Sequence, residues 1–455
     1  MIHMKGFITY ILPGLLLLVS PMLAGEEGSQ NAAPMVLTLE KAIEVALGQN
    51  KDVLIADQDR LKSDAQIGEA WSGALPQVSF GGGYTRNIKK PVMFIPPNTP
   101  LLNPTNSTQS IVISSDNSYQ AGIQLAQPLF SRKVGVALEI AKTYDQFTQE
   151  GYRATQQSVV LNVKKAFYGV LLLQQLVEAN RQALDVVRAN YENVKALYNN
   201  GNAAEFDLLR AEVQLANTEP TLISAENNFV LAKNGLKSLL SIPLEQEVDV
   251  QGNFVFEPMD PAVLNESART AVNQNPLLSQ LSLQESMLEK NISIERANYY
   301  PTVALTGAYM WQTQDNTFQF SNYNWAKILT VGLSVSYSIF DGFRTGERIQ
   351  EAVTDKEKVR YTRLKAEEGL RIQVQSEELK MAEAQRRIEG QEKNVGQAKK
   401  AVHIAQTRFK SGVGTQLELM DAQVAMTRTQ TNYAQAIYDY LVAKAEWQYA
   451  MGAAK

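Results

Sequence analysis

The stretch Leu329–Ser338, LTVGLSVSYS, alternates between apolar and small or polar residues at every position. Its apolar members are Leu329, Val331, Leu333, Val335 and Tyr337, and Thr330, Gly332, Ser334, Ser336 and Ser338 lie between them. Successive side chains of a strand point to opposite faces, so this pattern predicts a β-strand with one apolar face. At about 10 residues, it has the length of a tilted strand that spans a bilayer.

Three further segments alternate in the same way. Their apolar faces are Val78, Phe80, Gly82 and Tyr84; Tyr119, Ala121, Ile123 and Leu125; and Val303, Leu305, Gly307, Tyr309 and Trp311. We therefore expect strands at about 76–86, 119–130, 302–311 and 328–340. Tyr84, Tyr309, Trp311 and Trp325 lie near the loops, where an aromatic girdle would lie at a membrane surface. An ordinary half-buried soluble sheet is the alternative interpretation.

The distribution of proline predicts long helices. All 16 prolines lie at or before Pro301, and none lies between Pro128 and Pro220. Proline breaks helix interiors, and both proline-free stretches are rich in Ala, Gln, Glu, Lys, Leu and Arg. We expect long helical hairpins at about 132–240 and 344–450. A cytosolic coiled coil would share this composition.

The chain contains an internal repeat. Ala46–Asn50 matches Ala271–Asn275, and at the same offset Pro76 matches Pro301. At a smaller offset, Gly201 matches Gly412. The two predicted repeats are residues 35–260 and 261–455, and each reads helix, strand, loop, strand, long helix, turn, helix. The offset changes across Asn87–Ser118, a Pro- and Asn-rich stretch that we expect to be a surface loop.

The N-terminus is typical of a secretory signal peptide, which we place at residues 1–24. Lys5 supplies the basic element, Phe7–Val19 is mostly apolar, and small residues follow around Ala24. An uncleaved anchor is the alternative, but Phe7–Val19 is shorter than the ~20 residues that span a bilayer. Export of the chain would also disfavour a cytosolic coiled coil.

Composition excludes several kinds of chemistry. The chain has no cysteine, which removes disulfides and thiolate chemistry, and its two histidines, His3 and His403, cannot form a multi-histidine metal site. Its net charge of −4 argues against a nucleic-acid partner. No nucleophile elbow, Walker loop, dinucleotide fingerprint or zinc-protease motif occurs. We therefore predict no catalytic residues, no cofactor and no metal.

Four strands per chain cannot close a barrel, because closed barrels need about eight strands and open edges are not tolerated in lipid. The chain would therefore share a barrel with copies of itself, two copies giving 8 strands and three giving 12. Helices of the predicted length, roughly 100 Å at ~1.5 Å per residue, could form the staves of a tall tube with a polar lumen.

These features together resemble the TolC-like outer-membrane efflux proteins. The resemblance is carried by the signal peptide, the repeat, Asn275-Pro276-Leu277-Leu278, the proline before each repeat's first strand, and the Gly-x5-(Asp/Glu)-Leu element. It implies an α+β membrane protein, a homotrimeric 12-stranded β-barrel with four strands per chain. The barrel would continue through a mixed equatorial region into a long periplasmic α-helical barrel. The expected partners are two further copies of the chain, outer-membrane lipid, a periplasmic adaptor protein and an inner-membrane transporter.

The two helix turns carry the candidate site. Gly201 and Gly412 permit the positive φ that reverses a helical hairpin. Glu418 and Asp421 are one helical turn apart, so threefold symmetry would give two rings of carboxylates at a narrow mouth, where they would attract cations. An exposed, solvated helix face explains the same spacing.

The resemblance implies a tunnel constriction at Glu418 and Asp421, and it matches Asp207 to an acid that braces the closed state. The chain departs from the enteric member of the family at Phe409, which replaces a tyrosine, and at Gly414, which replaces an arginine. The bracing interactions of that member therefore lose two partners here. The turns would also dock the adaptor; their residues are Asn200, Gly201, Asn202, Ser411, Gly412, Val413 and Gly414.

The sequence therefore predicts an outer-membrane exit channel of a tripartite efflux or secretion system, with a large periplasmic extension and no enzymatic activity. Small residues at the turns would let helical hairpins of an adaptor approach closely. A free-standing porin for passive diffusion is the main alternative, and it is disfavoured by the predicted helix content. A periplasmic enzyme or a structural coiled coil is the third class.

Overall fold

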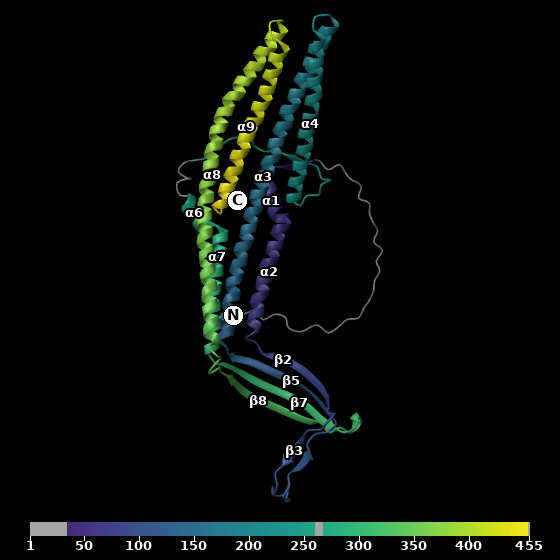
Figure 1. The fold of residues 1–455 in the computed structure, drawn as a ribbon, viewed down its shortest axis with the longest axis vertical. Helices are drawn as coiled ribbons and strands as arrows, with labels where there is room; N and C mark the ends of the chain where they lie inside the picture. The colour runs from purple at the N-terminus through teal and green to yellow at the C-terminus, as the bar shows by residue number, and fades with distance from the viewer. Residues whose placement is uncertain (1–33, 260–266, 454–455) are drawn as a thin grey trace.

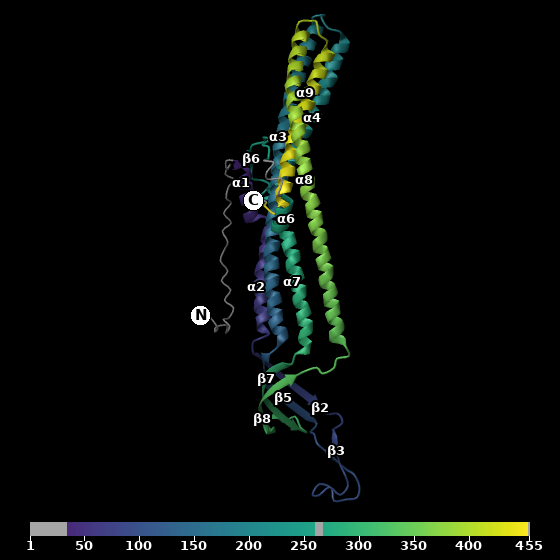
Figure 2. The same cartoon turned by 90° about the vertical axis from the view of Figure 1, so that its left-hand side faces the viewer.

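The computed structural model describes residues 34–259 and 267–453, so the predicted signal peptide at 1–24 lies outside the described residues. Long helices run along one axis of the molecule, and a sheet extends from one end of them (Figure 1). Figure 2 shows the helices as a narrow bundle that ends, opposite the sheet, in two hairpin turns. Below, the end of the sheet farthest from the helices is called the distal end. The end of the helical bundle that carries the two hairpin turns is called the tip.

The sheet contains four antiparallel strands. They are β2 (Gln77–Arg86), β5 (Asn117–Phe130), β7 (Thr302–Asp315) and β8 (Ala326–Ser336), in the order β2-β5-β7-β8. The four strands overlap the four predicted segments, and β7 is longer than predicted because it continues to Asp315. The central pairing of β5 with β7 joins the two repeats, and β2 and β8 are left as edges.

One face of this sheet is apolar across all four strands. Phe80, Ile123, Tyr309 and Leu329 lie side by side in one row, and Val78, Leu125, Gly307 and Val331 form the next. The exposed fractions of Phe80, Leu329 and Val331 are 72%, 73% and 74%. The rows on the opposite face hold small and polar residues such as Ser79, Gln124, Ala308 and Thr330. An exposed apolar face of this extent requires a non-aqueous environment or another chain to cover it.

Each repeat contributes one long helix and a shorter partner to the tip end. The first pair is α3 (Arg132–Asn199) with α4 (Glu205–Leu239), and the second is α8 (Arg344–Lys410) with α9 (Gln416–Ala450). The 68 residues of α3 give a length of about 100 Å at ~1.5 Å per residue. Pro220 lies inside α4, where it removes one backbone hydrogen bond without ending the helix.

Two further helices pack on the long helices near the sheet. Helix α2 (Lys51–Ser72) packs on α3, and helix α7 (Pro276–Arg296) packs on both α3 and α8. Each is preceded by a short helix, α1 (Leu39–Gln49) or α6 (Ser267–Gln274). One helix was predicted at the start of each repeat, whereas the structure has two. Asn50 and Asn275 separate them, because each has an extended backbone and its side chain caps the next helix.

The core lies at the middle of the long helices. One apolar cluster includes Val163, Phe167 and Leu240, and it is completed by two short parallel strands, β1 (Met35–Leu37) and β6 (Val248–Val250). A second cluster includes Val374, Tyr440 and Trp447. The pairing of β1 with β6 was not predicted, because three-residue strands leave no periodic pattern. Within residues 34–259 and 267–453, no helix is both long enough and apolar enough to cross a membrane.

The expected loop Asn87–Ser118 contains a small hairpin, so its prediction as a plain loop was incomplete. Strands β3 (Val92–Ile95) and β4 (Gln109–Val112) pair antiparallel beyond the distal end of the sheet. The Asn103 side chain organises the turn: its Nδ2 donates to the carbonyl oxygens of Ile95, Pro96 and Ser107, and its Oδ1 accepts from Thr105. This buried amide therefore joins three backbone carbonyls of the turn.

Candidate functional site at the hairpin tips

The two helix turns at the tip have the same backbone geometry. Gly201 and Gly412 both have φ of 73°. The N–H of Asn202 donates to the carbonyl of Leu197 at 2.8 Å, and that of Val413 donates to Arg408 at 3.1 Å. Gly201 and Gly412 donate to Tyr198 and Phe409 in the same way. Both turns are therefore Schellman motifs with glycine in the left-handed position.

The glycines of the tips serve different purposes. No atom lies within 4 Å of a Cβ placed on Gly201 or Gly412, so their conformation, not lack of space, selects glycine. A Cβ on Gly414 would lie 2.8 Å from the Arg408 Cβ, so glycine is required there by close approach. Asn200, Asn202, Ser411 and Val413 are exposed. The predicted docking residues thus form two small surfaces on rigid turns.

Glu418 takes part in a capping box at the start of α9. The Thr415 hydroxyl accepts from the Glu418 N–H at 3.2 Å, and the Glu418 carboxylate accepts from the Thr415 N–H at 3.4 Å. Arg408 Nε lies 3.5 Å from the same carboxylate. These roles of Glu418 were not predicted, although Thr415-x-x-Glu418 is a recognisable capping-box pattern. The pairing of Arg408 with Glu418 could not be predicted from the sequence, because Arg408 lies in the preceding helix, α8.

The structure places the three predicted acids on two hairpins. Glu418 and Asp421 are exposed on α9, and Asp207 is half-buried in the first turn of α4. Between these tips, the described part of the chain has no hydrogen bond or ion pair that joins Asp207 to either acid. The rings of carboxylates, the bracing role of Asp207 and adaptor docking stay predictions, since they depend on further chains.

A second polar cluster, which was not predicted from the sequence, lies at the middle of the bundle. Lys165 of α3 pairs with Glu446 of α9, and Lys380 of α8 lies 3.9 Å from Glu446 and donates to Glu377 at 2.8 Å. Glu377 is only 4% exposed, and its Oε2 has no hydrogen-bond partner. Burial, together with Glu446, raises the pKa of Glu377. Burial opposes ionisation of Glu446 too, but its interactions with Lys165, Glu377 and Lys380 outweigh burial and lower its pKa.

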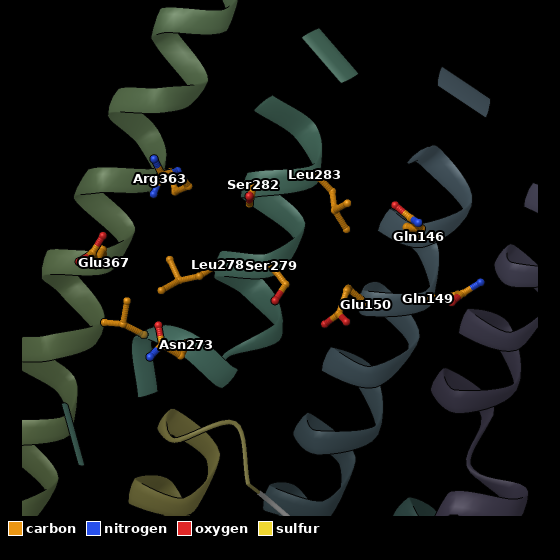
Figure 3. A pocket seen from close by; sticks show the side chains of 11 residues that line it. Gln146, Gln149, Glu150, Asn273, Leu278, Ser279, Ser282, Leu283, Arg363 and Glu367 are labelled. Carbon is orange, nitrogen blue, oxygen red and sulfur yellow. The ribbon is translucent and has the colours of Figure 1, made fainter. Parts of the chain in front are cut away.

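Figure 3 shows a pocket of about 620 Å³ formed by α3, α6, α7 and α8. Its lining is mostly polar, and Ser279, Glu150 and Arg363 point from three different helices. Arg363 is already paired with Glu285 at 3.0 Å, and Glu150 is paired with Arg153. Over the described ranges, no three His, Cys, Asp or Glu side chains are grouped to hold a metal ion. The pocket therefore has the character of a solvated groove between helices.

A sheet with one exposed apolar face, extended by helices of this length, defines a class of outer-membrane channel proteins. The model of the outer membrane efflux protein family matches residues 42–241 and 268–453. The chain belongs to this family. It is an outer-membrane channel protein with a periplasmic extension.

Individual relatives are distant but extend over most of the chain. The alkaline protease secretion protein AprF of Pseudomonas aeruginosa is 24% identical over 339 residues, which are 74% of this chain and 70% of the relative. The outer membrane protein TolC of Vibrio cholerae is 23% identical and covers 84% of this chain and 83% of its own. The solved structure of the CmeC channel of Campylobacter jejuni has a TM-score of 0.73 at 17% identity, over 91% and 86% of the two chains. That of VceC of Vibrio cholerae has a TM-score of 0.71 at 16% identity, over 91% and 96%.

Proposed function

We propose that three copies of this chain form the exit channel of a tripartite efflux or secretion system. The observation that carries this proposal is the sheet: an apolar face is exposed across four strands, and β2 and β8 end it as unpaired edges. Lipid cannot satisfy the N–H and C=O groups of an open edge, so the edges must pair with other copies. Three copies give a closed barrel of 12 strands with the small polar face lining a lumen.

The helices extend this lumen into the periplasm. Short connections join β5 to the long helix α3 and β8 to the long helix α8. A barrel formed by the strands would therefore continue as a barrel formed by the helices. At any height along the bundle, each chain has two long helices and two shorter partner helices. Three chains would therefore surround the path with twelve helices. Passage needs no covalent chemistry, and we propose none.

The hairpin tips would close the channel at its periplasmic end and bind the adaptor protein. Glu418 and Asp421 are exposed on α9, where threefold symmetry would place them as rings of carboxylates at the mouth. An adaptor protein would meet the two turns of each chain, and an inner-membrane transporter would supply the substrate. The relative named for alkaline protease secretion supports protein export as one possible task, and the family name supports efflux.

The proposal is tested by measuring the mass of the purified protein in detergent and its conductance in planar bilayers. We expect a mass of three chains and a continuous aqueous pore that opens poorly without its adaptor. A stable monomer that keeps its strands would contradict the shared barrel. A trimer that restores passive uptake but never export, in cells lacking their own exit channel, would instead indicate a free-standing porin.

A further inference from the structure

The charged residues of the sheet segments gather at one end. Within 76–130 and 301–340, the chain has four bases and two acids: Arg86, Lys89, Lys90, Lys327, Asp116 and Asp315. All six lie at the distal end, where β2 ends, β8 begins, and the loops connect the strands. Each chain therefore carries a net positive charge at the end of the sheet farthest from the helices.

Two of these bases continue the apolar face of the edge strands. Arg86 follows Val78, Phe80 and Tyr84 on the same face of β2, and Lys327 precedes Leu329 and Val331 on the same face of β8. In the register, Lys327 pairs with Trp311. Both basic side chains are exposed. Each edge strand thus presents apolar residues along its length and then a cation at its distal end.

The two acidic side chains of this region already have partners within the chain. Asp116 pairs with Lys90 at 3.1 Å, and Asp315 accepts from the N–H and the hydroxyl of Thr317 at 2.7 Å. In the part of the chain that the structure describes, no acid lies within ion-pairing distance of Arg86, Lys89 or Lys327. Their charges are therefore free to meet an anion from outside the chain.

Arg86 lies beside an aromatic ring at the end of a cluster of aromatic residues. The Arg86 guanidinium lies 5.4 Å from the centre of the Phe318 ring. Tyr84 stacks on Tyr119 at 4.8 Å, and Tyr119 contacts Tyr323 at 5.3 Å. Aromatic residues of this kind lie at the level of lipid headgroups, with their apolar bodies toward the acyl chains. The cations are thus placed at the boundary between the apolar surface and water.

Closure of the barrel, which rests on the proposed function, brings the edge cations together. In the closed barrel β8 of one copy lies beside β2 of the next, at a strand spacing of about 4.8 Å. The distal beginning of β8 then lies at the same end as the distal end of β2. Lys327 of one copy and Arg86 of the next would then both face the lipid, so each junction brings together two basic residues that lie on opposite edges of the sheet within a single copy.

We propose that each junction between copies binds the phosphate headgroup of an anionic membrane lipid, through Arg86 of one copy and Lys327 of the next. The lipid's acyl chains would lie along Phe80, Leu329 and Val331, and its phosphate would meet the unpaired cations. Charge complementarity and the apolar surface directly beneath favour a lipid over a soluble anion. Three such sites, one per junction, would fix the depth and orientation of the channel in its leaflet.

The test uses the intact trimer in neutral detergent, titrated with short-chain phosphatidylglycerol or with phosphatidylcholine of the same acyl length. Binding is followed by tryptophan fluorescence, because Trp311 and Trp325 lie at the distal end, and lipids retained are counted by native mass spectrometry. We expect phosphatidylglycerol to bind more tightly than phosphatidylcholine. Removing a surface cation weakens association with an anionic headgroup about fivefold, so Arg86→Gln with Lys327→Gln should lose about 25-fold.

Matched variants separate charge from folding. The variant Arg86→Lys with Lys327→Arg keeps both charges and should keep the preference for phosphatidylglycerol. The variant Lys393→Gln with Lys400→Gln removes two exposed charges from α8 and should leave that preference unchanged. Equal binding of the two lipids to the wild type, or a preference that survives the double glutamine variant, would overturn the inference. A saturable response to inorganic phosphate alone would show a soluble anion site instead. A protein that is not trimeric before titration would refute the proposed assembly, and the junction sites with it, whereas an intact trimer without lipid preference refutes only the inference.

Discussion

Asn50 and Asn275, at matching positions of the two repeats, make the same pair of interactions. The Asn50 Oδ1 accepts from Asp52 N–H at 2.9 Å, and its Nδ2 donates to the carbonyl of Leu239 at 2.8 Å. The Asn275 Oδ1 accepts from Leu277 N–H at 2.9 Å, and its Nδ2 donates to Ala450 at 3.1 Å. Each buried amide therefore joins the start of one helix to the end of its repeat's hairpin.

Replacing either asparagine with alanine removes a helix cap and leaves one carbonyl without its donor, partly buried at Leu239 and buried at Ala450. We expect Asn50→Ala and Asn275→Ala each to cost about 1–3 kcal/mol of stability, measured as a lower midpoint of thermal or denaturant unfolding. Asn298→Ala serves as the control, because the Asn298 side chain donates to Glu295, three residues earlier, and so makes a local contact. Equal effects at Asn298 and Asn50 would show that the link between helix and hairpin contributes nothing.

Glu377 gives the bundle a defined response to pH. Its pKa is raised in the folded protein, above the ordinary value of 4.5, so the folded state holds this proton more tightly than the unfolded state. Its contribution to stability is therefore fully present below the ordinary pKa and is lost as pH rises through the raised pKa. The lowered pKa of Glu446 acts in the opposite sense: its stabilisation is lost as pH falls through that pKa.

Glu377→Gln keeps an acceptor for Lys380 and supplies a donor toward Glu446. We expect this variant to gain about 1 kcal/mol at neutral pH and to lose the decline in stability above the ordinary carboxyl pKa. Glu446→Gln, the matched change, leaves Lys165 short of its partner and should destabilise. Unfolding midpoints measured from pH 4 to 8 distinguish the two, and a wild-type pH profile in Glu377→Gln would contradict the assignment.

The sequence predicts those parts of this fold that repeat along the chain. Alternation gave the four strands, and the absence of proline gave the long helices, because both are properties of local residue order. The Asn103 turn, the pairing of β1 with β6 and the Lys165–Glu446 ion pair depend on residues far apart in the chain, and no single-sequence pattern encodes them. At the tips, the glycine turns were predictable, but Arg408 as a partner of Glu418 was not.

The β3–β4 hairpin is separable from the barrel. Its base is held by the Lys90–Asp116 pair and by Lys90 donating to Asn316, whereas its outer part is held by the β3–β4 pairing and by Asn103 within the hairpin itself. Replacing residues 92–112 with a short Gly-Ser linker, while keeping Lys90 and Asp116, is expected to leave trimer abundance and export unchanged. Gel analysis of unheated membranes measures the trimer. Loss of assembly would show that the hairpin packs on a neighbouring copy.

The tip carboxylates are tested best by substitutions that preserve the helix cap. Glu418→Gln with Asp421→Asn removes charge but keeps an oxygen that accepts from Thr415 N–H. We expect cation selectivity and block by multivalent cations to weaken in bilayer recordings, because the mouth loses its negative potential. Glu418→Ala is the comparison, since it removes the cap as well. Unchanged selectivity in the Gln/Asn variant would place both residues on a solvated face outside the path.

Docking at the tips is tested at the residues beside the glycines. Gly201 and Gly412 are unsuitable, since any side chain at φ of 73° strains the turn itself. Asn202 and Val413 are exposed, and Val413 has an exposed fraction of 70%. Tryptophan at both positions would block close approach of an adaptor hairpin, and overpacking of about 1–3 kcal/mol per site would weaken docking about tenfold or more.

The readout pairs export with assembly. In cells that depend on this channel, Asn202→Trp with Val413→Trp is expected to abolish drug resistance or secretion, while trimer abundance in the outer membrane stays normal. Asn202→Ala with Val413→Ala removes bulk and should export normally, which separates steric block from loss of side-chain contacts. Cross-linking to the adaptor should fall in step with export. Wild-type export from the double tryptophan variant would show that the adaptor meets the tube elsewhere, along the helices and not at their turns.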